Sequence, residues 1–127
     1  MALGRYSCAL ASDACRRGLS LRAAFYWRSA EFFMRPNDPD RPAARNSFLQ
    51  TIKSVYGLTP DDRHAVAYAD QQHRGFLRAY RFKPVQAKST ILFFGGFDSS
   101  IEELMEAFLF LRDEGYDVIA FEGPRPG

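Results

Sequence analysis

Two consecutive glycines followed by an acid form the segment of this chain most suited to chemistry. Gly95-Gly96-Phe97-Asp98 comes directly after an apolar run and directly before a segment with helical spacing. Glycines allow the backbone to turn sharply and to approach a bound molecule closely. Backbone amides at such a turn, beside a helix N-terminus, can stabilise a developing negative oxygen. The segment therefore predicts either an oxyanion hole or a tight turn whose glycines serve geometry alone, and spacing favours neither.

A second glycine-containing turn follows the next apolar segment. Glu122-Gly123 lead into Pro124-Arg125-Pro126-Gly127. Because ligands of open α/β sheets bind at the carboxyl ends of the strands, this turn is expected at the same edge as the first. Asp98, Glu122 and Gly123 are therefore candidate substrate-binding residues. The residues alone favour the structural alternative, in which the second turn is only a rigid loop that leaves a strand.

Residues that commonly bind metals or activate nucleophiles are few and scattered. Cys8 and Cys15 are seven residues apart on one face of a predicted helix, and no histidine lies near them in the sequence. They are expected to be buried free thiols, and no metal site and no cofactor is expected. His64 and His73 are expected to lie on the surface or in turns.

Residues 60–127 show the patterns of β, β and then β-α-β. Ala65–Ala69 and the strictly alternating Phe76–Lys83, joined by a short polar link, predict an antiparallel hairpin. Ile91–Phe94 is a continuous apolar run, which predicts a strand covered on both faces. Asp117–Phe121 is the next predicted strand, and the short crossover between these two makes them a parallel pair.

The predicted crossover helix follows the first glycine turn and ends at Gly115. Ser99 with Glu102, or Ser100 with Glu103, predicts a capping box at its start. Its predicted apolar face consists of Ile101, Leu104, Met105, Phe108 and Leu111.

Residues 1–59 read as helical. A helix over 5–17 ends at Gly18, Ser20 is expected to cap a second helix, and a third runs from Asp40 to Gly57. The second helix is apolar on both sides, which predicts that it lies between other elements. Its aromatic side chains are expected to be buried, and they include Phe25, Phe32 and Phe33.

Composition limits the function classes. The 127 residues, 46% of them hydrophobic, suit one small globular domain or a piece of a larger one. The net charge of +2, without a long basic run, gives no electrostatic footprint for nucleic acid. No run approaches the length of a membrane span and none resembles a signal peptide, so no membrane partner is expected and a cytoplasmic location is the default.

Three segments resemble one branch of the α/β-hydrolases. Ile91–Leu104, which contains Gly95-Gly96-Phe97-Asp98-Ser99, is similar to that branch's third strand and first helix. Val118–Gly127 is similar to its next strand and Asp-Gly-Pro-Gly-Gln-Gly loop. Tyr26–Pro36, followed by Asp38-Pro39, resembles the helical N-terminal segment that builds part of the lid. The branch includes 2,6-dihydroxypseudooxynicotine hydrolases, fermentation-respiration-switch-type esterases and fungal polyketide-shortening hydrolases.

The resemblance implies an α/β fold, with an N-terminal helical segment followed by the first four strands and first helix of an incomplete α/β-hydrolase sheet. Residues 1–59 would be lid-like, and residues 60–127 the N-terminal part of the core. Gly96 and Phe97 would supply the backbone oxyanion hole, with the N–H of Phe97 as the donor. The complete enzyme would hydrolyse an ester or a ketonic C–C bond of a small molecule.

The chain departs from the branch in two ways. Glu122 stands where Asp is usual, and Arg125 and Pro126 replace Gly and Gln. No G-x-S-x-G nucleophile elbow is present, and the triad acid and histidine would come later still in hydrolase chain order. No hydrolase turnover is therefore expected from residues 1–127 alone.

Two other classes of function remain as alternatives. A β-α-β unit with a glycine turn and an acid after the next strand resembles half of a dinucleotide-binding fold, but positions 95–100 read G-G-F-D-S-S rather than G-x-G-x-x-G. The chain could instead be a non-catalytic domain that dimerises or docks on a partner. An open apolar edge at Thr90–Phe94 is expected to make it self-associate.

Overall fold

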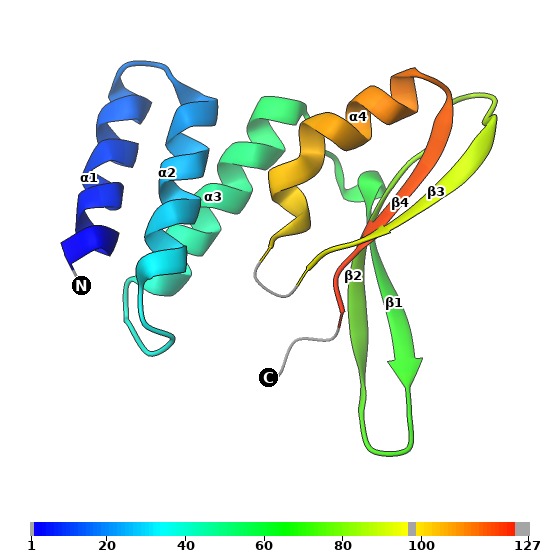
Figure 1. Ribbon diagram of the computed structural model, residues 1–127, viewed down its shortest axis with the longest axis horizontal. Helices are drawn as coiled ribbons and strands as arrows, with labels where there is room; N and C mark the ends of the chain where they lie inside the picture. Colours follow the sequence, from blue (N-terminus) through cyan, green and yellow to red (C-terminus); the bar gives the residue numbers. More distant parts are fainter. Residues whose placement is uncertain (1, 97–98, 124–127) are drawn as a thin grey trace. The chain divides into compact units, whose positions relative to one another are not determined.

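A computed structural model describes residues 2–96 and 99–123 of the chain (Figure 1). The chain divides into two compact units, Met1–Leu58 and Thr59–Gly127. The first unit contains helices only, and the second contains a mixed β-sheet with its crossover helix.

The helical unit consists of α1 (Ala2–Arg16), α2 (Ser20–Phe33) and α3 (Arg41–Tyr56), and α2 packs against both α1 and α3. The prediction that α2 lies between other elements is therefore confirmed. Gly57 ends α3 in the left-handed conformation, with φ 63°, which a glycine adopts without steric cost. Ser20 is the first residue of α2 rather than its cap, and no side chain caps that helix at Leu19.

The fully buried apolar residues of α2 are alanines, and of its aromatic residues Trp27 packs against the cluster of Ala30, Met34 and Ala44 while partly buried. Ala23, Ala24 and Ala30 are fully buried, whereas Phe25, Phe32 and Phe33 are 43%, 53% and 40% exposed. These three rings are therefore not buried within residues 1–127, and their packing in the complete protein stays a prediction. Alanine side chains let helix backbones approach closely, so the sides of α2 that meet its neighbours are those without bulk.

The helical unit also buries a charge. The Glu31 carboxylate in α2 accepts a hydrogen bond from Arg28 at 3.3 Å and lies 3.5 Å from the Arg45 guanidinium of α3. Arg41 donates to the backbone oxygen of Glu31 at 3.2 Å. A buried carboxylate is tolerated only when it is paired, so this cluster joins α2 to α3 at a defined register.

The sheet contains β1 (Arg63–Ala69), β2 (Arg74–Phe82), β3 (Ser89–Phe94) and β4 (Tyr116–Phe121) in the order β1-β2-β4-β3. A single 3-10 turn, η1 (Pro60–Asp62), precedes β1. β1 and β2 form the predicted antiparallel hairpin, and β3 and β4 form the predicted parallel pair. β2 pairs with β4 antiparallel and so joins the hairpin to the parallel strands.

One face of the sheet carries the crossover helix. The crossover consists of a 3-10 turn, η2 (Ile101–Leu104), that continues into α4 (Met105–Asp113). The Phe93 and Phe108 rings lie 5.2 Å apart, and Phe82, Met105 and Val118 are also buried on this side. Gly115, with φ 100°, follows the helix as predicted.

The opposite face of the sheet is open in the described part of this unit. Leu92 and Phe94 are 65% and 70% exposed, so the prediction of a β3 strand covered on both faces is wrong for the structure. Strand register places Ile119, Phe121 and Val66 on that same face. The apolar run of β3 thus has one covered and one open side.

The predicted capping box does not form at the start of the crossover. Ser99 donates its hydroxyl to the Gly96 oxygen at 3.2 Å, and Ser100 donates its hydroxyl to the Glu102 carboxylate. η2 has no side-chain cap from Ser100. The first turn is 3-10 rather than α-helical.

The cysteines and histidines differ in how they match the expectations. Cys8 is half-buried and Cys15 is exposed, so the prediction of two buried thiols fails for Cys15. Burial, and then the charges of Asp40 and Asp38, raise the pKa of the Cys8 thiol. His64 and His73 are exposed, as predicted.

Candidate functional site

The glycine turn lies at the carboxyl ends of the two parallel strands. Gly95 and Gly96 follow β3 directly, and the Gly95 N–H donates to the Phe121 oxygen at 3.4 Å, next to the last β3–β4 pair. Phe97 and Asp98, which carry the predicted oxyanion donor and a predicted substrate contact, lie outside the described residues. Gly95 and Gly96, the two residues before them, lie as expected directly after the carboxyl end of β3.

Of the two glycines, Gly95 lies where an added side chain would make a close contact, and neither needs an unusual backbone conformation. Neither has a positive φ. A Cβ added to Gly95 would lie 3.1 Å from the Ser99 hydroxyl oxygen and 3.6 Å from a methyl carbon of Ile101. A side chain at Gly95 would therefore crowd the start of the crossover. At Gly96 the same hydroxyl is 3.7 Å from the Cβ position, which is an ordinary contact.

Glu122 joins the end of β4 to the start of the crossover. Its carboxylate accepts a hydrogen bond from the Ile101 N–H at 3.0 Å, and its own N–H donates to the Arg78 oxygen of β2 at 3.3 Å. The predicted contact of Glu122 with substrate stays a prediction, but the carboxylate already binds the chain itself. Gly123 is exposed, and its Cβ position meets no atom within 4 Å.

A second carboxylate, predicted from the sequence only as a capping-box partner of Ser99, lies in the first turn of the crossover. Glu102 is 7% exposed and accepts hydrogen bonds from the Tyr80 hydroxyl at 3.3 Å and from the Ser100 hydroxyl. Tyr80 belongs to β2 and stacks on Phe82, with the ring centres 6.1 Å apart. The alternation of β2 placed Tyr80 and Phe82 on one face, and that signal could have identified Tyr80 as a partner for the crossover.

The other end of the parallel pair carries an ion pair instead of a site. Asp117, the second residue of β4, accepts two hydrogen bonds from Arg81 of β2 at 3.2 and 2.8 Å and is buried. The hydrogen bond from Arg81 lowers the pKa of the Asp117 carboxyl, burial opposes that shift, and a hydrogen bond from Thr90 of β3 adds to it. Asp117 of β4 thus joins β2, through Arg81, and β3, through Thr90, at the end of the parallel pair opposite the glycine turn.

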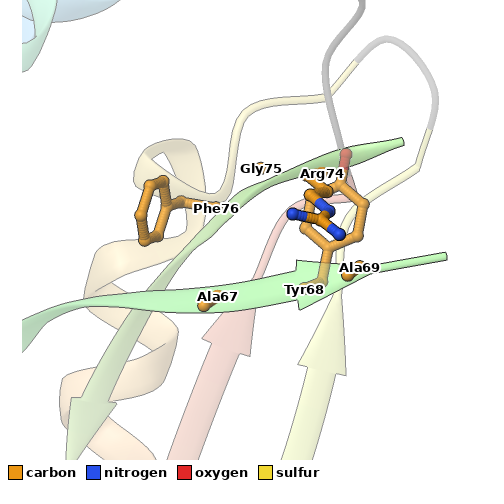
Figure 2. A pocket seen from close by; sticks show the side chains of 6 residues that line it. All are labelled: Ala67, Tyr68, Ala69, Arg74, Gly75 and Phe76. Atoms are coloured by element: carbon orange, nitrogen blue, oxygen red, sulfur yellow. The ribbon is translucent and has the colours of Figure 1, made fainter. Parts of the chain in front are cut away.

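A shallow hollow of about 520 Å³ lies on the β1–β2 hairpin, and Gly95, Gly96, Glu122 and Gly123 are not among the residues that line it. Figure 2 shows it on the two hairpin strands, with Phe76 standing apart from Tyr68 and Arg74. The Tyr68 ring covers Gly75, where an added Cβ would meet a ring carbon at 3.0 Å. The hollow is lined by Ala67, Tyr68, Ala69, Arg74, Gly75 and Phe76.

Neither a metal centre nor a membrane span emerges from residues 2–96 and 99–123. No group of three His, Cys, Asp or Glu side chains in that part of the chain could hold a metal ion. None of its helices has the length and apolar character needed to cross a membrane.

The sheet has the strand order β1-β2-β4-β3, with an antiparallel hairpin, a parallel β3–β4 pair and a glycine turn after β3. These features define the N-terminal part of an α/β-hydrolase fold, and three helices precede it in the chain. No family model matches the sequence, and no curated protein matches it. The fold therefore rests on solved structures.

Three solved structures share this fold at low sequence identity. A structure titled AbyA5 Wildtype matches with TM-score 0.72 and 17% identity over 96% of this chain and 34% of its own. A second, titled AbyA5, gives the same TM-score and identity over 36% of its own chain. The 2,6-dihydroxy-pseudo-oxynicotine hydrolase matches with TM-score 0.55 and 18% identity over 98% of this chain and 37% of its own. The chain thus spans about a third of the length of each protein.

Proposed function

We propose that this chain is the N-terminal portion of a serine-type α/β-hydrolase that cleaves an ester or a ketonic C–C bond in a small molecule. A serine from later sequence attacks the carbonyl carbon, a histidine accepts the serine proton and gives it to the leaving group, and an acid orients the histidine. The Gly96–Phe97 segment supplies one backbone donor to the oxyanion, and the residue after the serine supplies the other. Residues 1–127 contain no such elbow, so this mechanism takes its nucleophile from outside them.

The glycine turn between β3 and η2 carries this proposal. It lies at the carboxyl end of a parallel strand pair, where amides of the turn and of the helix start can converge on one oxygen. Gly95 has a steric reason to be glycine, since a side chain there would crowd Ser99 and Ile101. One of the solved structures with this fold is titled a hydrolase, which supports the reaction class.

The decisive experiment extends the gene. One helix, one strand and two loops of ordinary length place the nucleophile elbow about 25–50 residues past Gly127. We expect a G-x-S-x-G sequence in that window, and hydrolysis of a chromogenic ester only by the longer product. Replacing the elbow serine with alanine should abolish that hydrolysis. An open reading frame through the window without a serine, cysteine or aspartate elbow would overturn the proposal.

A second candidate, self-association without catalysis, is favoured by the open side of β3. Among the described strands β3 has only β4 as a neighbour, it has no charge and no proline, and Leu92 and Phe94 are exposed. Strand edges with these features pair with other chains. We propose that a second copy of this chain pairs there, which would enlarge the sheet.

Light scattering tests this candidate. Chain 1–127 should scatter as a dimer or larger species, and Leu92→Lys should shift it toward monomer. Val66→Lys is the matched control, because Val66 is exposed on the same face but lies on β1 at the opposite edge. A sharp monomer peak for the unaltered chain at high concentration, or equal effects of both substitutions, would contradict pairing through β3.

A further inference from the structure

The β1–β2 hairpin carries a row of exposed basic and aromatic side chains on one face. Arg74, Phe76 and Arg78 alternate along β2, so their side chains project from the same face, roughly 7 Å apart along the strand. The Phe76 ring is 69% exposed, and both arginines are exposed. β4 pairs with β2 only from Ala79 to Phe82, so the outer part of the hairpin extends past β4 (Figure 1). In the described part of the chain, no ion pair joins Arg74 or Arg78 to an acid.

Small residues of β1 leave this row open from the side. Each member of the row is paired across the hairpin with an alanine: Arg74 with Ala69, Phe76 with Ala67, and Arg78 with Ala65. An alanine side chain ends at its Cβ, so these residues of β1 do not rise to the height of the row. The hollow of about 520 Å³ has both Ala67 and Ala69 in its lining, together with Arg74 and Phe76 (Figure 2). Side chains that arrive from beyond β1 can therefore reach the row across the alanines.

β1 also presents backbone hydrogen-bonding groups at a sheet edge. Among the described strands, β1 has only β2 as a neighbour. The Asp70 N–H donates to the His73 oxygen at 2.9 Å where the hairpin closes. Hydrogen-bonded and non-hydrogen-bonded pairs alternate along an antiparallel ladder, so the N–H and C=O groups that point away from β2 are those of Ala65, Ala67 and Ala69. The free edge and the open side of the row therefore belong to the same three residues.

We propose that β1 accepts an extended acidic segment of a partner protein as an additional strand of this sheet. A strand that bonds to the outward groups of the three alanines places every second side chain on the face of the row. Two strand spacings, about 10 Å, separate it from β2, a gap that a glutamate and an arginine side chain bridge together. Carboxylates would then face Arg74 and Arg78, and an apolar side chain between them would face Phe76. The backbone ladder supplies affinity and the charges select the partner, independently of any hydrolase function.

Charge argues against a second copy of this chain at the β1 edge. The four described strands contain one acidic residue, Asp117, which is buried and paired with Arg81. Two β1 edges paired with each other would also bring their arginine rows together. A single-stranded nucleic acid offers regularly spaced anions, but it cannot continue a β-ladder. An acidic peptide strand is the occupant that satisfies both the edge and the row.

Fluorescence polarisation with a labelled peptide, TETVTET, tests the backbone part of the proposal on chain 1–127. Its glutamates flank a central valine at every second position. We expect saturable binding below about 1 mM. Ala67→Pro removes one outward N–H and leaves the bonds to β2 intact, so it should weaken binding about tenfold. The peptide TETPTET has the same charge but lacks the central N–H, and it should lose binding similarly. Circular dichroism checks that the variant keeps its fold.

A charge swap tests the row itself. Arg74→Glu combined with Arg78→Glu should weaken binding of TETVTET about tenfold and create binding of TKTVTKT, in which lysines replace the glutamates. Arg5→Glu combined with Arg22→Glu is the matched control, because it changes the net charge equally. Both control residues are exposed and lie in the first turns of α1 and α2, where a glutamate suits the helix dipole. The control should leave the affinity for both peptides unchanged.

Each other outcome would overturn the proposal. Absence of saturable TETVTET binding, equal binding of TETPTET, or equal weakening by the two arginine pairs would mean that no acidic strand pairs with β1. Tighter binding of oligothymidylate, lost in the variant of Arg74 and Arg78, would assign the row to single-stranded nucleic acid instead. Light scattering that shifts from dimer to monomer in Ala67→Pro would assign the edge to a second copy. An absent nucleophile elbow in the longer gene would remove the hydrolase function and leave these results standing.

Discussion

The helix α2 of the first unit and the helix α4 of the second pack against their neighbours through different kinds of side chain. In the helical unit, α2 meets its neighbours through alanines and through the charge cluster around Glu31, while its phenylalanines are exposed. In the sheet unit, large apolar side chains such as Phe82, Met105, Phe108 and Val118 fill the space under α4. Apolar spacing therefore predicts burial for α4, which covers one face of the sheet, and predicts it poorly for α2, whose buried positions are mostly alanines.

The largest expected effect is a loss of packing in the sheet unit. Phe82 is 2% exposed and Phe76 is 69% exposed, although alternation places both on one face of β2. Phe82→Ala should lower the free energy of unfolding by about 3–5 kcal/mol. Phe76→Ala should change it by less than about 0.5 kcal/mol, because its ring is already in water. Urea unfolding followed by circular dichroism measures both, and similar losses in the two variants would contradict the exposure of the Phe76 ring.

A somewhat smaller effect is expected at the charge cluster of the helical unit. Glu31→Ala removes the carboxylate shared by Arg28 and Arg45, whose side chains are only 14% and 15% exposed. We expect a loss of about 2–3 kcal/mol, below the usual cost of breaking a fully buried pair because the guanidinium groups keep some access to water. Glu106→Ala provides the exposed control, and thermal unfolding compares the two. A loss of less than about 0.5 kcal/mol at Glu31 would mean that alanine packing alone holds α2 against α3.

The four strands of residues 2–96 and 99–123, with their hairpin, parallel pair and crossover, were predictable from the sequence, because alternation and flanking glycines are local signals. The bounds of the third helix were also predicted, since Asp40, Pro42 and Gly57 are strong signals of a helix start and end. The exposure of Phe25, Phe32 and Phe33 was not predictable from spacing, because both sides of α2 are apolar and only the packing partner decides which is buried.

The candidate site was predictable in position and less so in its connections. Glycine spacing after an apolar run located Gly95 and Gly96, and the next strand end located Glu122. The bond from Ile101 to Glu122 joins residues 21 positions apart, so a local capping signal at Ser99 and Ser100 led to the wrong partner. Similarly, Tyr80 and Glu102 meet only because β2 lies beside β4 in the sheet.

The smallest expected effect concerns pH and the amino end of β4. The pKa of the Asp117 carboxyl is lowered, chiefly by the Arg81 hydrogen bond, so the folded chain binds a proton at this site less readily than the unfolded chain does. The resulting stabilisation is complete above the ordinary aspartate pKa of about 3.9 and is lost as pH falls through the lower folded-state value. Asp117→Asn should therefore reduce stability at pH 7, and the difference from the unaltered chain should shrink below about pH 4.

Urea midpoints at pH 7, pH 4 and pH 2.5 check this, with Asp113→Asn as the control. Asp113 pairs with Arg112 on the surface, where an ion pair contributes little, so that variant should follow the unaltered chain at every pH. The comparison between variants also cancels the contribution of Asp70, whose pKa is lowered by backbone hydrogen bonds from Gln72 and His73 in the hairpin turn. Added salt should weaken the Asp117 effect only in part, because Asp117 is buried while the Arg81 side chain is 44% exposed. The stability difference between Asp117→Asn and the unaltered chain could instead stay constant from pH 7 to pH 2.5. Asp117 would then stabilise the fold through packing and neutral hydrogen bonds rather than through its charge, as the alanine contacts of α2 do.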